Sequence, residues 1–193
     1  GKSTLLRLLA GLEDPAAGAF VLDGRDTLTT LRYESWEEQV AYIPQDPTIF
    51  HASLRENLTF YNPQASDEHL HAVIEKLGLS ELLVQLPQGL DTLIGEGARG
   101  LSGGQAQRIA LARVVLDERK RIILFDEPTA HLDIETEMEL KQAMVEVMQE
   151  RLVVFATHRL HWLDTLDYLL VLEEGKLVEQ GTTTQLLEST THF

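Results

Sequence analysis

The sequence predicts an α/β protein with a parallel sheet at its centre, on three observations. Two unbroken apolar runs, IILF at 122–125 and LVVF at 152–155, are typical of strands that are buried on both faces. From about residue 117 onward, strand and helix patterns alternate, as they do where helices connect parallel strands. The 193 residues, of which 44% are hydrophobic, are enough for one sizeable domain with an inserted lobe.

Each element follows from its own local pattern. Apolar spacing and the positions of Gly and Pro predict helices over residues 2–12, most of 50–116, 134–149 and 184–187. A break at Pro63 and an N-cap at Ser66 divide the long helical region, which is broken again at Pro87. Tight turns are expected at 23–24 and 174–175. The predicted strands are AFVL, VAYI, RIILF, LVVFA, YLLVL and KLV.

Composition excludes several classes of protein. The net charge of −15 argues against a nucleic-acid-binding surface, which needs a basic face. Seven histidines without any cysteine exclude disulfides and zinc–thiolate sites. No apolar run approaches the roughly 20 residues that cross a bilayer.

The chain opens with GKST, the last four residues of the phosphate-binding pattern G-x-x-x-x-G-K-[ST]. In such a loop the amide of Gly1 and its neighbours would cradle phosphates, Lys2 would reach the outer two, and the Ser3 hydroxyl would bind Mg²⁺. A four-residue match recurs by chance, but a predicted helix follows at once, as this chemistry requires. Because the motif is cut, we expect the natural N-terminus to lie upstream.

A second candidate anion site is LSGGQ at 101–105. Ser102 is a good N-cap, and Gly103 and Gly104 would weaken a helix interior but leave the backbone uncovered at a helix start. Such an end attracts anions, although a loop that simply caps a core helix fits equally well. Within the helix that follows, Gln105, Gln107 and Arg108 are expected on the polar side.

Acidic and polar side chains follow three of the predicted strands. Asp126 and Glu127 come after IILF, at the sheet edge where ligands of parallel sheets bind. Asp126 would hold Mg²⁺ through water and Glu127 would polarise an attacking water; two solvated acids are the alternative. Gln45 follows VAYI and His158 follows LVVFA, and neither is informative by itself, since a lone histidine after a strand is more often structural.

Taken together in this order, GKST, Gln45, LSGGQ, Asp126-Glu127, AHLD and His158 make the whole chain resemble the nucleotide-binding domain of ATP-binding cassette (ABC) proteins. The resemblance implies a P-loop NTPase with a RecA-like core, 1–47 and 117–193, and an inserted helical subdomain, 48–116, that carries the signature. In that family the strand leading into the phosphate-binding loop lies between LVVFA and YLLVL. These two strands are therefore expected to lack that neighbour here. The adenine-stacking aromatic residue and the start of the loop are also expected upstream.

The family's residue roles carry over onto the matching positions. Glu127 would be the general base, Gln45 would touch Mg²⁺ and the attacking water, and His158 would contact the γ-phosphate. Asp133 would lie at the interface between two cassettes, whose signature motifs each cap the ATP held by the other. The implied ATP-binding residues are Gly1, Lys2, Ser3, Thr4, Gln45, Ser102, Gly103, Gly104, Gln105, Asp126 and Asp133, with Ser3, Gln45 and Asp126 as Mg²⁺ ligands.

Several segments are similar to exporter cassettes. DTLIGEG resembles the exporter pattern T-x-V-G-x-x-G, with Thr92 and Gly95 in place, Ile94 in the position of Val, and Gly97 one residue before the position of the last glycine. LSGGQAQR and DEPTAHLD are similar to subunits of the bacterial thiol-reductant (cysteine/glutathione) exporter linked to cytochrome bd assembly. The resemblance implies ATP hydrolysis that drives export, with a second cassette, identical or different, and a transmembrane domain fused upstream, at the cytoplasmic face of the inner membrane. Pro128 departs from common exporter usage, in which alanine is frequent.

Two other classes share the signature motif. ABC-type ATPases of DNA repair and chromosome maintenance separate their halves by a long coiled coil, whereas the 55 residues 46–100 contain no sustained heptads. The acidic charge also disfavours DNA. Translation-factor cassettes carry two cassettes and basic linkers, and remain an alternative. Six hydrophobic helices encoded upstream would decide for a transporter, and that membrane domain would choose the substrate.

Overall fold

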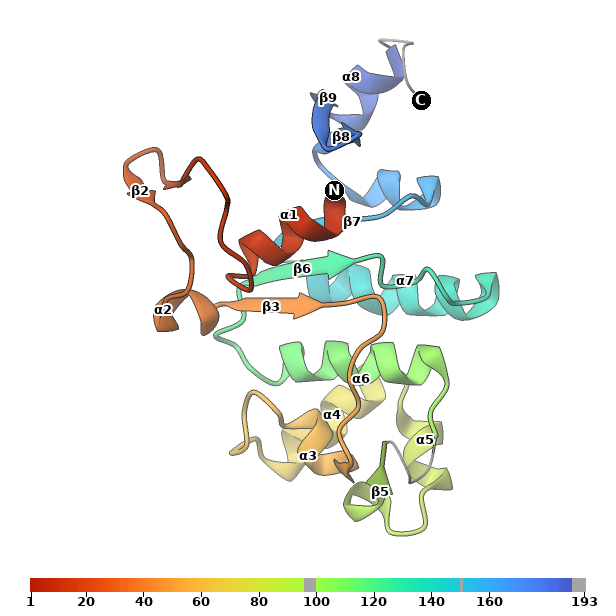
Figure 1. The fold of residues 1–193 in the computed structure, drawn as a ribbon. Helices are drawn as coiled ribbons and strands as arrows, with labels where there is room; N and C mark the ends of the chain where they lie inside the picture. The colour runs from red at the N-terminus through yellow and green to blue at the C-terminus, as the bar shows by residue number, and fades with distance from the viewer. Residues whose placement is uncertain (96–99, 150, 189–193) are drawn as a thin grey trace.

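The structure is a computed structural model that describes residues 1–95, 100–149 and 151–188 of the chain (Figure 1). Its centre is a three-stranded parallel sheet in the order β3 (Val40–Ile43), β6 (Ile122–Asp126) and β7 (Leu152–Ala156). Strand β6 pairs with β3 on one side and with β7 on the other. The predicted α/β fold with a parallel core is confirmed.

Alternate residues of the strands face two different helical layers. Val40, Leu124 and Ala156 pack with Leu6 of α1 (Lys2–Leu9) in the smaller of two buried clusters. Ile123 and Phe125 belong instead to the larger cluster, which includes buried residues of α6 (Gly103–Val115) and α7 (Ile134–Met148). Figure 1 shows α1 on one face of the sheet and α6 on the other. Because both faces are covered, the three strands are apolar apart from Tyr42 and the final Asp126.

The segment between β3 and β6 is mainly helical, as predicted. It forms α3 (Leu54–Leu58), α4 (Asp67–Lys76), α5 (Ser80–Gln85), a 3₁₀ turn at Gly89–Asp91 and α6. Ser66 caps α4 by accepting a hydrogen bond from the His69 N–H, which confirms the predicted cap. Two antiparallel strands, β4 (Ala52–Ser53) and β5 (Leu93–Ile94), were not predicted, because two residues are too short to show strand alternation. The subdomain boundaries near residues 47 and 117 stay predictions.

The remaining elements lie around this core. The predicted turns at 23–24 and 174–175 are present, with all four residues in the left-handed region, and they join β1 (Phe20–Leu22) to β2 (Asp26–Leu28) and β8 (Leu169–Glu173) to β9 (Lys176–Gly181). The first helix ends at Leu9 rather than near residue 12, because Gly11 turns the chain at a φ of 71°. Strand β2, helix α2 (Glu34–Glu37) and a 3₁₀ helix at Leu160–Thr165 were not predicted, whereas the last helix, α8 (Thr183–Glu188), was.

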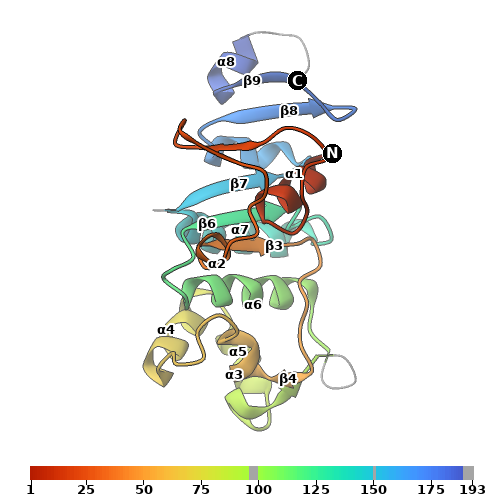
Figure 2. The ribbon, with the colours of Figure 1, turned by 60° about the vertical axis from the view of Figure 1, so that its left-hand side comes forward.

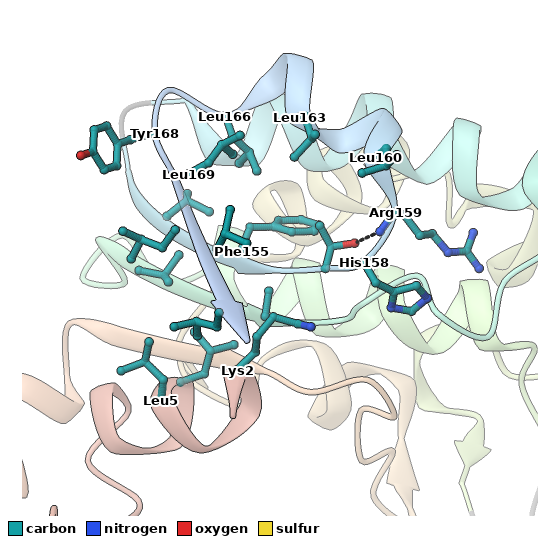
Figure 3. Close-up of a pocket in the computed structure, with 18 residues that line it drawn as sticks. Lys2, Leu5, Phe155, His158, Arg159, Leu160, Leu163, Leu166, Tyr168 and Leu169 are labelled. Carbon is teal, nitrogen blue, oxygen red and sulfur yellow. Dashed lines mark hydrogen bonds between the residues drawn. The ribbon is translucent and has the colours of Figure 1, made fainter. Parts of the chain in front are cut away.

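A groove of about 490 Å³ separates β7 from β8. Within the described part of the chain β7 pairs with β6 alone and β8 with β9 alone, as expected from the family's strand order. Figure 2 shows β8 and β9 beyond β7, and Figure 3 shows the groove's mainly apolar lining, with Lys2 and His158 near one end and Tyr168 toward the other. The groove therefore runs between the edges of β7 and β8 that pair with no described strand. Its end at Lys2 lies at the predicted phosphate site.

Two glycines with similar backbone conformations allow a test of close packing. Gly95 (φ 97°) lies against the backbone just before β4, where an added Cβ would be 2.6 Å from the Phe50 carbonyl oxygen, whereas Gly18 (φ 91°) has no atom within 4 Å of its Cβ position. We expect Gly18→Ala to lower the free energy of unfolding by about 1 kcal/mol through backbone strain alone. Gly95→Ala should cost about 1–3 kcal/mol more, because backbone must move. Urea unfolding followed by circular dichroism measures both, and equal losses would contradict the packing argument.

Candidate nucleotide-binding site

The carboxyl end of β6 brings Asp126 and Glu127 to the N-terminus of α1. The Ser3 hydroxyl donates a hydrogen bond of 2.9 Å to Asp126 Oδ1. The Lys2 ammonium lies 3.9 Å from Glu127 Oε1. Gly1 is the N-cap of α1, and Thr4 is exposed on its first turn. Two acids, a lysine, a hydroxyl and the positive end of a helix thus meet at one sheet edge, which suits a phosphate with a bound cation.

The backbone of Glu127 fixes the direction in which its side chain leaves the sheet. Its N–H donates to the Ala156 carbonyl at 2.9 Å and so extends the β6–β7 pairing by one residue. Its φ of 48° then turns the chain away from the sheet in the left-handed region, which non-glycine residues seldom adopt. The side chain reaches His158, whose Nδ1 lies 2.8 Å from Glu127 Oε2. Lys2 and His158 therefore contact different oxygens of one carboxylate.

Asp126 accepts a second hydrogen bond, from a residue to which the sequence analysis gave no role. The Tyr42 hydroxyl donates to Asp126 Oδ2 at 2.9 Å. Burial, and then this hydrogen bond to a carboxylate, raise the pKa of Tyr42 to about 12, so the phenol stays protonated and donates. Tyr42 lies in the predicted strand VAYI. The only signal for its contact with Asp126 is the position of that strand next to β6.

The oxygen donors at this edge fit magnesium. The Ser3 hydroxyl and the Asp126 carboxylate are hard oxygen ligands, and Mg²⁺ in nucleotide sites is held by one or two such groups together with phosphates and water. Outside residues 96–99, 150 and 189–193, no three His, Asp or Glu side chains gather as a ligand set. The residues thus fit an ion that arrives with a nucleotide and not a site built from protein ligands alone.

Gln45, the third predicted Mg²⁺ ligand, belongs to a different group of contacts. Its side-chain nitrogen lies 2.8 Å from His131 Nε2, and the other ring nitrogen of His131 lies 3.1 Å from Asp46 Oδ1. The Gln107 side chain donates to the Gln45 carbonyl at 2.8 Å. Gln107 was expected on the polar side of its helix, but its side chain is only 3% exposed. It is buried because it reaches the backbone of the loop that follows β3. A pocket of about 100 Å³ is lined by Gln45, Gly103 and His131 among others.

The signature motif forms a helix cap, as predicted. The Gln105 N–H donates to Ser102 Oγ at 3.2 Å, and Gln105 Oε1 accepts from the Ser102 N–H at 3.0 Å, which makes a capping box. Ser102 and Gly103 are exposed, as an anion site requires, but Gly104 is buried. A Cβ on Gly104 would lie 2.6 Å from Thr136 Cγ2. The expectation that both glycines stay uncovered is therefore wrong for Gly104, which lets α6 pack against α7.

Asp133 caps the next helix. It accepts hydrogen bonds from the backbone N–H and the hydroxyl of Thr136, at 3.0 and 2.8 Å. The backbone hydrogen bond, followed by the hydroxyl, lowers the pKa of Asp133. Its charge is thus fixed at the start of α7. Gly97, the other glycine of the exporter-like segment, lies outside the described residues.

A fully buried glutamate, Glu137, joins the loops behind the site. Its Oε1 accepts from Thr129 at 2.6 Å and Trp162 at 3.1 Å and lies 3.0 Å from His161 Nε2, while Arg159 pairs with Oε2. Burial by itself raises the pKa of Glu137, but the hydrogen bonds from Thr129 and Trp162 and the charge of Arg159 outweigh it, so the pKa is lowered. Glu137 therefore connects the segment after Glu127 to the one after His158.

A parallel α/β sheet that gathers these side chains at its carboxyl edge, beside a helix begun by GKST, defines a P-loop NTPase fold. The protein-family description "ABC transporter" matches residues 1–130, and the chain belongs to this family. Among the described helices, none has the length and apolar character needed to span a membrane.

Individual relatives are transport proteins by name. The chain is 48% identical over 188 residues to the glutathione/L-cysteine transport system ATP-binding/permease protein CydC of Bacillus subtilis, covering 97% of this chain and 33% of that protein. It is 37% identical to the CydC protein of Escherichia coli, with 97% and 32% covered. A solved structure of a bacterial Atm1-family ABC exporter with ATP bound matches with a TM-score of 0.85 at 34% identity, over 99% of this chain and 33% of that one. The chain thus spans about a third of each relative.

The four contacts of Glu137 predict a large and pH-dependent effect of its removal. Glu137→Gln should lower the free energy of unfolding at pH 7 by about 3 kcal/mol, because an amide cannot pair with Arg159 and leaves that charge without its partner. The pKa of Glu137 is lowered on folding, so its contribution is complete above the unfolded value of about 4.3 and is lost as pH falls through the native value.

Unfolding by urea at pH 7 and at several values below pH 4.5 measures both effects. The wild-type protein should lose stability in acid more steeply than Glu137→Gln. The control is Glu135→Gln, which changes an exposed carboxylate on the same helix and should move stability by no more than about 0.5 kcal/mol. Parallel pH curves for wild type and Glu137→Gln would contradict the assignment.

Proposed function

We propose that this chain is the domain of an ABC exporter that binds and hydrolyses ATP. The observation that carries the proposal is the contact of Ser3 with Asp126, and of Lys2 and His158 with Glu127, at one edge of the sheet. Lys2 and the backbone from Gly1 to Thr4 bind the phosphates. Ser3 and Asp126 would hold Mg²⁺, and Gln45, which contacts His131 in this structure, would be the third ligand.

Glu127 is the general base of the proposed reaction. Its carboxylate takes a proton from the water that attacks the terminal phosphate, which is the task of a positioned acid–base group. His158 fixes one oxygen of that carboxylate and also contacts the terminal phosphate, and Lys2 stabilises negative charge on the same phosphate. Bound Mg²⁺ neutralises phosphate charge when it is present.

The signature end of α6 serves a second nucleotide. Ser102 and Gly103 are exposed at the N-terminus of a 13-residue helix, and Gln105 completes the cap. We propose that this surface, with Gly104 beneath it, covers the ATP bound by a partner cassette, identical or different. Asp133 lies at the start of the neighbouring helix, α7, and couples the two ATP sites.

The transported substrate is proposed from the relatives. Two proteins named for glutathione and L-cysteine transport are 48% and 37% identical to this chain, so we propose export of thiol reductants. The transmembrane domain lies on the same polypeptide, as the ATP-binding/permease names of these relatives suggest, and the cassette lies on the cytoplasmic face of the inner membrane. A DNA-maintenance or translation role is not favoured, because the relatives are transporters and short helices, α3 to α5, precede the signature.

Replacement of Glu127 tests the catalytic assignment. In the complete transporter Glu127→Gln should reduce ATP turnover by about 10²–10⁴-fold and leave ATP binding intact, because the amide keeps the shape and loses the base. Steady-state phosphate release and equilibrium binding of ATP are measured side by side. Glu118→Gln, at an exposed carboxylate away from the site, is the control and should hydrolyse ATP normally. Turnover of Glu127→Gln close to wild type would remove Glu127 from this role.

Replacement of Ser102 tests the shared nucleotide. Ser102→Arg should fill the anion site and impair the ATP on the opposite subunit rather than on its own. A mixed dimer with the change in one subunit, probed by site-specific nucleotide trapping, separates the two sites. Ser80→Arg, at the start of helix α5, is the control and should leave trapping unchanged at both. If trapping is lost at the altered subunit's own site, the geometry is wrong.

A further inference from the structure

The Tyr42 hydroxyl and the Ser3 hydroxyl bind opposite oxygens of the Asp126 carboxylate, each at 2.9 Å. We propose that Tyr42 is a positioning residue for the metal site: its hydrogen bond fixes the rotation of the Asp126 carboxylate so that Oδ1 stays turned toward Ser3. The inference rests on the proposed function, since it concerns the same Mg²⁺ site.

The sheet places Tyr42 for this contact. In the parallel register Tyr42 of β3 is level with Leu124 of β6, two residues before Asp126. Tyr42 and Leu124 both pack in the buried cluster that contains Leu6 of α1, so they share the sheet face covered by that helix. Side chains alternate along a strand, which puts Asp126 on this face too. Two strands and a helix thus supply Tyr42, Asp126 and Ser3 from one side.

The two hydrogen bonds have different fates when metal binds. Ser3 Oγ would itself be a metal ligand, so its contact with Asp126 would adjust on metal binding. Tyr42 is in the middle of a paired strand and donates to the oxygen that faces away from Ser3, so its bond can persist. Asp126 is 7% exposed, and water gives it little other help. Tyr42 is therefore the contact that holds the carboxylate before and after metal binding.

A purely structural role for Tyr42 makes a different prediction. If the ring mattered only through packing, removing the hydroxyl would leave metal affinity unchanged, because phenylalanine fills the same place in the cluster. If the hydroxyl positions Asp126, its loss weakens metal binding while ATP affinity at saturating metal is retained. The change Tyr42→Phe removes one oxygen atom and separates the two.

The experiment uses the complete transporter with three variants. The Mg²⁺ concentration for half-maximal hydrolysis is measured at saturating ATP, and Mn²⁺ binding is followed by electron paramagnetic resonance with a non-hydrolysable ATP analogue. Tyr42→Phe should raise both metal constants about tenfold, the effect of losing one hydrogen bond to a charged group, with the KM for ATP at saturating Mg²⁺ unchanged. Tyr33→Phe, at an exposed tyrosine, should match wild type.

Asp126→Asn separates the inference from the function beneath it. If Asp126→Asn weakens Mn²⁺ binding and Tyr42→Phe does not, the role of Tyr42 is wrong and the proposed site stands. If Asp126→Asn leaves Mn²⁺ binding intact, the metal site and the role of Tyr42 both fall. A lower melting temperature for Tyr42→Phe with unaltered metal constants would likewise overturn the inference in favour of packing.

Discussion

The parallel pairing of β6 with strands on both sides is the interaction on which the rest of the structure depends. Because β3, β6 and β7 run the same way, the residues after each strand emerge at one edge. Three segments separated by about 80 and 30 residues in the sequence therefore end at this edge, and Asp126 and Glu127 occupy the central position. The buried strands set the direction, and the polar groups of the site are Asp126 at the end of β6 and the first residues beyond the strands.

Hydrogen bonds then fix the loops beyond the strands. Ser102 and Asp133 each satisfy N–H groups at the start of a helix, and Glu137 ties the start of α7 to the loop that follows His158. A movement of α7 would therefore displace both Asp133 and the loop that follows His158. The proposed partner-facing surface and the proposed catalytic edge share this buried carboxylate, which gives a physical route between them.

Local patterns were sufficient for the parts of the fold with strong signals, and insufficient where distant residues decide. Apolar runs predicted the strands of the sheet, and short motifs predicted the caps at Ser66 and Ser102. The burial of Gly104 depends on Thr136 of another helix, and the hydrogen bond of Tyr42 depends on the register of two strands. Neither is written in adjacent residues. The same holds for β4 and β5, two-residue strands that exist only because they pair with each other.

The left-handed backbone of Glu127 has a consequence for the evolution of this domain. A glutamate at a φ of 48° carries a conformational cost that glycine would not. Replacement by glycine would relax the turn after β6 while it removes the proposed base, so folding stability and turnover are opposed at this position. A cassette freed from the need to hydrolyse ATP would thus gain stability from glycine at this position.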